Sequence, residues 1–110
     1  VELTLHALPW REFELDDFRA NALFYDPFGP RDEPESWTPE CFEVARRHLA
    51  GNGVLATYSA ATRVKEAMVA AELEIATYPG PGRKREITLA ARKPEALSHA
   101  ERLSAEKYSA

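Results

Sequence analysis

A carboxylate directly after a short apolar run is the strongest candidate for chemistry in this sequence. Residues 22–25 are apolar, Asp26 follows them, and Pro27, Gly29 and Pro30 then turn the chain. A continuous apolar run predicts a strand buried on both faces, and open α/β sheets bind ligands beyond the carboxyl ends of such strands. A carboxylate there can accept a hydrogen bond from an amine and take up its proton. We therefore expect Asp26 to be catalytic; the alternative is an acid that caps a turn.

Apolar and aromatic side chains follow Asp26 and predict a surface for a flat ligand. Phe28, Pro30 and Trp37 can together form a wall on which a splayed-out base stacks, as aromatic side chains do in RNA-binding sites. Trp37 is equally expected as a core residue beneath the loop. The sequence leaves these two roles of Trp37 open.

The charge of the chain is mildly acidic and limits where a polyanion can bind. The 110 residues include 14 basic and 18 acidic side chains, which give a formal net charge of −4. Phosphate binding therefore needs a local basic patch. Arg83, Lys84 and Arg85 form such a run beside a Gly-Pro turn, and we expect them to contact phosphate. The alternative is a solvated beginning of a strand.

The histidines and the cysteine predict neither a metal site nor a disulfide framework. His6, His48 and His99 are scattered without the spacing of metal ligands, so we expect no metal. The single cysteine, Cys41, excludes an internal disulfide and fits a reducing compartment, which predicts a cytoplasmic location. No apolar run approaches the roughly 18 residues of a membrane span, so we expect no membrane partner.

Alternating strand and helix patterns predict an α/β domain. Thr38 can cap a helix that stops at residues 51–53, and Ser59 can cap a second helix. Helices separate most strands, which predicts parallel pairing, whereas no helix fits before the last strand, which must be antiparallel. The predicted fold is a mostly parallel sheet with an antiparallel last strand and helices on its faces. Strands are expected at residues 1–7, 22–25, 54–58, 73–78 and 86–91.

Three motifs, in this order, resemble those of one methyltransferase family. Residues 26–30, Asp-Pro-Phe-Gly-Pro, and residues 34–40, Pro-Glu-Ser-Trp-Thr-Pro-Glu, are similar to the pattern Asp-x-Phe-x-Pro followed by Asn-Pro-x-x-Trp-Thr. Residues 57–61, Thr-Tyr-Ser-Ala-Ala, and residues 79–86, Pro-Gly-Pro-Gly-Arg-Lys-Arg-Glu, resemble the next two motifs. The chain thus resembles the MnmC-like methyltransferases of the tRNA wobble-uridine pathway, which convert an aminomethyl group on uridine to methylaminomethyl.

This resemblance implies a partial Rossmann-like sheet of a class I methyltransferase, with S-adenosylmethionine as cofactor and tRNA as partner. Residues 1–92 correspond to the C-terminal half of such a domain, and residues 93–110 to a helical or disordered tail. The residues implied to face the cofactor are Leu8, Pro9 and Asp26. Asp26 is also implied to face the methyl-accepting amine.

Departures from the family pattern predict that the chain alone is inactive. The glycine-rich loop that holds the cofactor is not found, nor is the acid that binds its ribose. Leu8-Pro9 stands where the family has Gly-Asp. The expectation is therefore an enzyme fragment, and the alternative is a degenerate module used for protein interaction. Because a half-sheet exposes a strand edge and apolar surface, we also expect a homo-oligomer.

Overall fold

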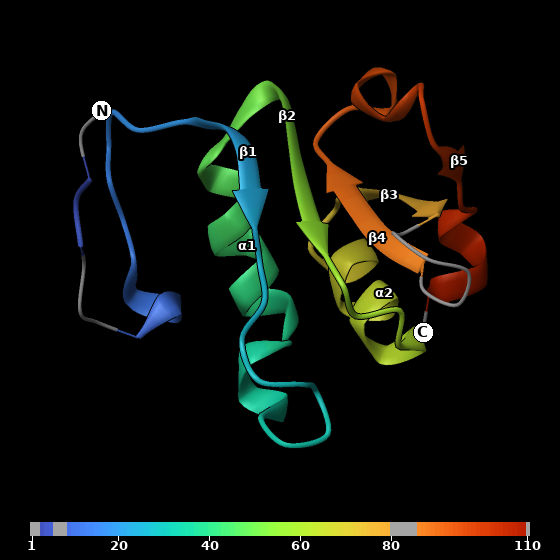
Figure 1. Cartoon of the computed structure of the whole chain (residues 1–110), viewed down its shortest axis with the longest axis horizontal. Coiled ribbons are helices and arrows are strands. Elements are labelled where there is room, and N and C mark those ends of the chain that lie inside the picture. Colours follow the sequence, from blue (N-terminus) through green and yellow to red (C-terminus); the bar gives the residue numbers. More distant parts are fainter. Residues whose placement is uncertain (1–2, 6–8, 80–85, 110) are drawn as a thin grey trace.

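A mixed sheet organises the chain, with the strand order β1-β2-β4-β3-β5 (Figure 1). The computed structural model describes residues 3–5, 9–79 and 86–109. Within these residues the helices are α1 (Pro39–Arg47) and α2 (Thr62–Ala70), together with the 3-10 turns η1 (Trp10–Glu12), η2 (Pro34–Ser36), η3 (Pro94–Leu97) and η4 (Ala105–Tyr108). The strands are β1 (Ala20–Phe24), β2 (Leu49–Thr57), β3 (Glu74–Pro79), β4 (Glu86–Ala91) and β5 (Glu101–Arg102).

The strand directions confirm an α/β fold, with the reversed strand β4 inside the sheet and the two-residue strand β5 antiparallel to β3 at its edge. β1 pairs with β2 in parallel, through a crossover that contains α1. β4 is antiparallel to both β2 and β3, so it lies between them and not at an outer edge. β1, β2 and β3 therefore run in one direction, because α2 returns the chain to the far side of the position that β4 then fills.

Both α-helices pack on one face of the sheet. Their apolar stripes meet inward-pointing strand residues in one core cluster. The spacing of residues 64, 67, 68 and 71 places all four side chains in this core, as a period of 3.6 requires. A smaller cluster on the opposite face includes Leu97 of η3 and Leu89 of β4.

The helix boundaries differ in part from the prediction. Thr38 is the N-cap of α1 as expected, but α1 ends at Arg47, and residues 51–53 lie within β2. The chain turns into the strand at once because Leu49 already pairs with Ala20 of β1. Ser59 as N-cap of the second helix was also wrong: α2 begins at Thr62, and Ala61 is its N-cap.

The amino-terminal part of the sheet was predicted incorrectly. A strand was expected at residues 1–7, but residues 3–5 form no strand, and the side chains of Leu3 and Leu5 are exposed. Residues 1, 2, 6 and 7 lie outside the described residues. β1 was expected to be buried on both faces, but Phe24 is 81% exposed. Phe24 points to the side of β1 opposite Tyr25 and belongs to neither buried cluster, so this side of β1 is uncovered within the described residues.

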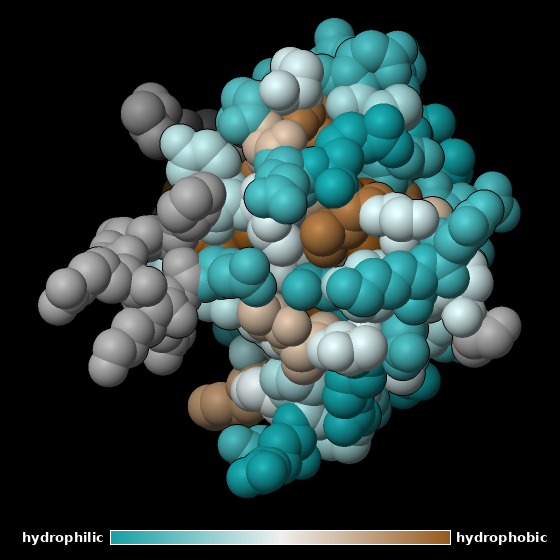
Figure 2. Space-filling view, turned by 90° about the vertical axis from the view of Figure 1, so that its right-hand side faces the viewer, coloured by the Kyte–Doolittle hydropathy of each residue, from teal (hydrophilic) through white to brown (hydrophobic). Residues whose placement is uncertain are grey.

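The opposite side of the sheet is closed by the C-terminal residues. Arg102 of β5 forms an ion pair with Glu74 of β3, with 2.6 Å between the nitrogen and oxygen atoms. Leu97 and Tyr108 are buried, which ties both C-terminal turns to the domain. Figure 2 shows that this face is mainly hydrophilic, with small recessed apolar patches. The residues after Pro94 thus form short 3-10 turns and a two-residue strand, β5.

Gly53 should be essential for stability because β1 crosses it closely. A Cβ atom on Gly53 would lie 2.5 Å from the carbonyl oxygen of Ala20, where the β1–β2 register shifts. We expect Gly53→Ala to reduce the free energy of unfolding by about 1–3 kcal/mol in urea titrations. Gly51→Ala is the matched control in the same strand, since its Cβ would only reach Lys93 Nζ at 3.4 Å. Equal stability of the two variants would contradict this steric account.

Candidate functional site

Asp26 lies where the carboxyl ends of two adjacent parallel strands meet, as the sequence predicted. The backbone N–H of Tyr25 donates to the carbonyl of Ala56 at 2.9 Å, so the pairing of β1 with β2 continues to the residue before Asp26. Asp26 Oδ1 accepts hydrogen bonds from Thr57 Oγ1 and from the backbone N–H of Tyr58, both at 3.2 Å. Among the described residues, no hydrogen bond reaches Oδ2, which leaves that oxygen available to a ligand.

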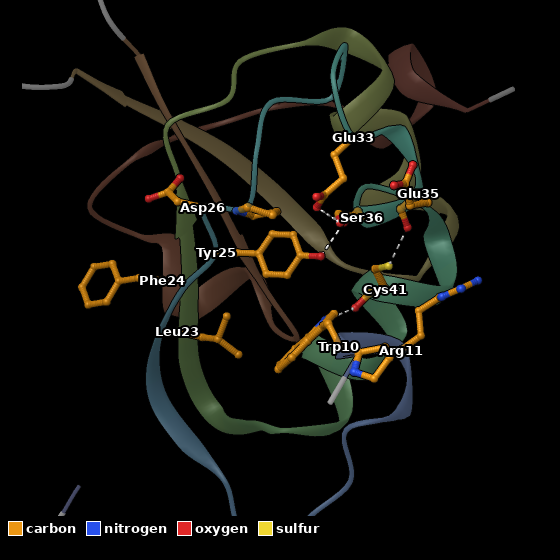
Figure 3. Close-up of a pocket in the computed structure, with 12 residues that line it drawn as sticks. Trp10, Arg11, Leu23, Phe24, Tyr25, Asp26, Glu33, Glu35, Ser36 and Cys41 are labelled. Carbon is orange, nitrogen blue, oxygen red and sulfur yellow. Dashed lines mark hydrogen bonds between the residues drawn. The ribbon is translucent and has the colours of Figure 1, made fainter. Parts of the chain in front are cut away.

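Alternation along β1 separates two surfaces at this strand end. Figure 3 shows Leu23 and Tyr25 on one side of the strand and Phe24 and Asp26 on the other. Asp26 borders three hollows, with volumes of about 600, 230 and 60 Å³. The carboxylate therefore stands on a ridge between hollows, and is itself exposed to solvent.

The largest hollow has walls that are fixed by hydrogen bonds. The Tyr25 hydroxyl donates to the carbonyl of Ser36, and Trp10 Nε1 donates to the carbonyl of Cys41 at 2.9 Å (Figure 3). Burial, and then the neighbouring Cys41, raise the pKa of Tyr25 well above its ordinary value, so the hydroxyl stays a donor. Glu33 and Glu35 add negative charge to the same hollow. Three carboxylates, of Asp26, Glu33 and Glu35, and one guanidinium, of Arg11, line this hollow beside aromatic rings, so it favours a cationic organic ligand over an anionic one.

The loop after Asp26 is held by Trp37, which lies in the core. Trp37 is 5% exposed, its Nε1 donates to the carbonyl of Phe28 at 2.8 Å, and its ring packs edge-on against Tyr25. Trp37 and Pro30 line the 230 Å³ hollow beside Asp26. The ring of Phe28 is 77% exposed, so it is free to contact a ligand.

The remaining residues of the predicted site are only partly placed. Pro9 lines the largest hollow together with Asp26, which brings these two residues to one site. Leu8 and the basic run Arg83, Lys84 and Arg85 lie outside the described residues.

The sequence did not single out Thr57 and Tyr58 as functional residues. Tyr58 is half exposed and borders the 60 Å³ hollow with Asp26. A usable signal was present, because Tyr58 follows β2 as Asp26 follows β1, and the carboxyl ends of parallel neighbours meet. That signal requires β2 to end at Thr57, which the predicted strand of residues 54–58 placed one residue too late.

His48 is a satisfied core residue. Its Nε2 accepts a hydrogen bond from the backbone N–H of Leu15 at 3.0 Å, so Nδ1 carries the proton and donates to the carbonyl of Val44 at 2.7 Å. No cluster of metal-ligating side chains exists within residues 3–5, 9–79 and 86–109. In the same ranges no helix is both long and apolar enough to cross a bilayer.

Comparisons with known proteins identify relatives of this chain. The sequence model of S-adenosyl-L-methionine-dependent methyltransferases matches residues 2–93. The tRNA 5-methylaminomethyl-2-thiouridine biosynthesis bifunctional protein MnmC of Ralstonia nicotianae is 40% identical over 72 residues, which cover 66% of this chain and 11% of that protein. An uncharacterized protein of Methanocaldococcus jannaschii is 35% identical over 78 residues, which cover 71% of this chain and 22% of that protein.

A solved structure shares the arrangement of the sheet and helices. The crystal structure of MNMC2 from Aquifex aeolicus superimposes with a TM-score of 0.67 at 29% sequence identity, covering 73% of this chain and 26% of that chain. The present chain therefore matches about a quarter of that structure. It matches a still smaller part of the Ralstonia protein, 11% of its length.

Burial of Tyr25 should make the fold sensitive to alkaline pH. Because its folded-state pKa is raised, the unfolded chain loses this proton first as the pH passes about 10, and stability falls from there. Tyr25→Phe removes this titration, so its free energy of unfolding should fall less steeply between about pH 9 and pH 11 than that of the wild type. Near pH 7 the free energy of unfolding of the variant should be about 1 kcal/mol lower, because the hydrogen bond from the Tyr25 hydroxyl to Ser36 is missing. If urea titrations at several pH values show that the free energy of unfolding falls equally steeply with pH in both proteins, this account is wrong.

Proposed function

Because the chain belongs to the family of S-adenosyl-L-methionine-dependent methyltransferases, we propose that it carries the acceptor side of a tRNA-modifying N-methyltransferase. The proposed methyl acceptor is the aminomethyl group of wobble uridine. The observation that carries this proposal is the placement of Asp26. Its Oδ1 accepts hydrogen bonds from Thr57 and Tyr58, while its Oδ2 is left for a ligand. The relatives named for 5-methylaminomethyl-2-thiouridine biosynthesis support the choice of substrate.

The chemistry of the acceptor explains why a carboxylate is needed. An alkyl amine resembles lysine, with a pKa of about 10.4, and therefore reaches the site protonated. Its nitrogen must present a free lone pair in order to attack a methyl group. A fixed carboxylate can accept a hydrogen bond from the ammonium, orient the nitrogen and take up one proton. Asp26 is assigned this role.

The described residues fit the acceptor side but do not complete a cofactor site. S-adenosyl-L-methionine, when bound, supplies the methyl group. Pro9 and Asp26 border the largest hollow, so they are the described residues that we assign to the cofactor side, with Leu8 as their neighbour in sequence. Among the described residues no glycine-rich loop follows a strand: Gly51 and Gly53 lie within β2, and Gly29 is the one glycine of the loop after β1. We therefore expect no methyl transfer by this chain alone, and a methylated product from it would contradict that expectation.

Recognition of the RNA is assigned to two parts of the surface. Phe28 is exposed beside Asp26, and Pro30 lines the adjoining hollow, so both can contact the base. Trp37 acts in this assignment by holding the loop. Arg83, Lys84 and Arg85 are proposed to contact phosphate, which a chain of net charge −4 can do only through a local basic run.

Replacing the carboxylate should weaken binding of the amine. We expect Asp26→Asn to weaken binding of 5-aminomethyluridine about tenfold or more in calorimetric titrations, because a hydrogen bond to a charged group is lost. Asp32→Asn is the matched control, since Asp32 is an exposed acid on the same loop. If Asp26→Asn and Asp32→Asn bind the nucleoside equally well, Asp26 does not hold the amine.

A second candidate function, a protein-interaction module, is favoured by the open side of the sheet. β1 is an edge strand within the described residues, and Phe24 on it is 81% exposed. An exposed strand edge with apolar surface favours pairing with another chain, such as a second copy.

This alternative is tested by the association state of the chain. We expect sedimentation at high protein concentration to show a dimer or larger assembly, and Phe24→Lys to make the chain monomeric. Phe28→Lys serves as the control, because Phe28 is similarly exposed but lies on the loop and not on the strand. A wild-type chain that stays monomeric at high concentration would exclude self-association through this edge.

A further inference from the structure

Two buried threonines face each other beside Asp26, at the carboxyl end of β2. Thr57 and Thr88 are partners in the β2–β4 register and are 1% and 0% exposed. Thr57 lies two residues after Leu55, and Thr88 two residues before Ala90, so both side chains are on the sheet face of the helix-covered core. Valine has the same branched shape without a polar atom, so packing alone does not require hydroxyls here. A buried hydroxyl is costly unless it is hydrogen-bonded, which directs attention to its partners.

The hydrogen bonds of Thr57 have only one consistent direction. The backbone N–H of Ser59 lies 3.3 Å from Thr57 Oγ1, and an N–H group can only donate. Thr57 Oγ1 therefore accepts from Ser59, and its single proton remains for Asp26 Oδ1 at 3.2 Å. The second donor to that same oxygen is the backbone N–H of Tyr58.

Thr88 extends this chain of hydrogen bonds to β4. Its hydroxyl donates to the carbonyl of Ser59 at 2.7 Å, and this bond fixes the turn whose N–H groups point toward Thr57 and Asp26. The orientation of the exposed Asp26 carboxylate, just after the edge strand, is thus set by buried groups on the next two strands of the sheet, β2 and β4.

We propose that Thr57 is a positioning residue that gives the two oxygens of Asp26 different roles. Oδ1 is held as an acceptor of protein hydrogen bonds, and Oδ2 is the oxygen that meets the substrate amine. This inference rests on the proposed function for the identity of the ligand, an aminomethyl-substituted pyrimidine nucleoside. In the proton transfer, the N–H bond of the ammonium breaks and an O–H bond forms on Oδ2. The products are a neutral amine and a carboxylic acid whose Oδ1 still accepts both protein hydrogen bonds.

The ligand-free chain provides the first test, by NMR of the Tyr58 amide. An amide proton that donates to a fixed carboxylate is shifted downfield and protected from exchange. In Thr57→Val the carboxylate loses its second tether, so we expect the Tyr58 amide signal to move upfield and to exchange about tenfold faster. Thr57→Ser keeps the hydroxyl and should match the wild type. Thr77→Val is the control, because Thr77 lies on β3 and makes no hydrogen bond to Asp26.

The second test is the binding of 5-aminomethyluridine to the same proteins. We expect Thr57→Val to weaken binding about tenfold, with Thr57→Ser and Thr77→Val unchanged. If Thr57→Val changes neither the Tyr58 amide nor the affinity, the positioning role is wrong. If the wild type does not bind the nucleoside, the proposed function fails, while the amide comparison still decides the role of Thr57. Should Thr57→Val not fold, Thr57→Ala replaces it and is expected to give the same two changes.

Discussion

The parallel pairing of β1 with β2 is the constraint on which the candidate site depends. It brings Asp26 to the backbone of Tyr58, so a carboxylate and its donors come from strand ends that the crossover through α1 separates. The same pairing turns Tyr25 toward the helix-covered core, where its hydroxyl donates to Ser36. Because successive side chains of a strand alternate, one anchored residue points inward and the next is presented to solvent.

The loop that follows is shaped by this inward anchor. Tyr25 packs against Trp37, and Trp37 in turn holds the carbonyl of Phe28. The two aromatic residues expected beside the ligand, Phe28 and Trp37, therefore have different roles. Trp37 supports the loop from beneath, and Phe28 is exposed on the surface of the loop. A rigid support under an exposed ring lowers the entropy lost when a ligand is bound.

The sequence predicted the parts of the fold that have strong local signals. Apolar periodicity predicts the core positions of α2. The short connection before residue 86 predicts the reversed strand β4, and an acid after an apolar run predicts the strand-end position of Asp26. The errors lie where tertiary contacts decide. Gly51 and Gly53 suggested a helix stop, but pairing with β1 draws them into β2. Phe24 suggested a strand buried on both faces, but local sequence cannot reveal which face of a strand the other elements cover.

The hydrogen bond between Thr57 and Asp26 was also beyond local reasoning. Threonine is a common residue in strands, so Thr57 does not stand out in the sequence. Its hydrogen bond to Asp26 joins residues that are 31 positions apart. Likewise, Ser59 suggested a helix cap, whereas its N–H and carbonyl serve Thr57 and Thr88. Only the sheet register brings these groups together, and register is set by pairing across the whole sheet.

The separation of 32 residues between Asp26 and Tyr58 has a consequence for how the protein is made. A ribosome adding about 5–20 residues per second produces Asp26 seconds before it produces the groups that hold its carboxylate. Closing this crossover is a non-local step that must overcome the entropy of loop closure before any contact rewards it. The nascent chain therefore carries an unoriented acid at first, and the carboxylate becomes oriented when β2 pairs with β1.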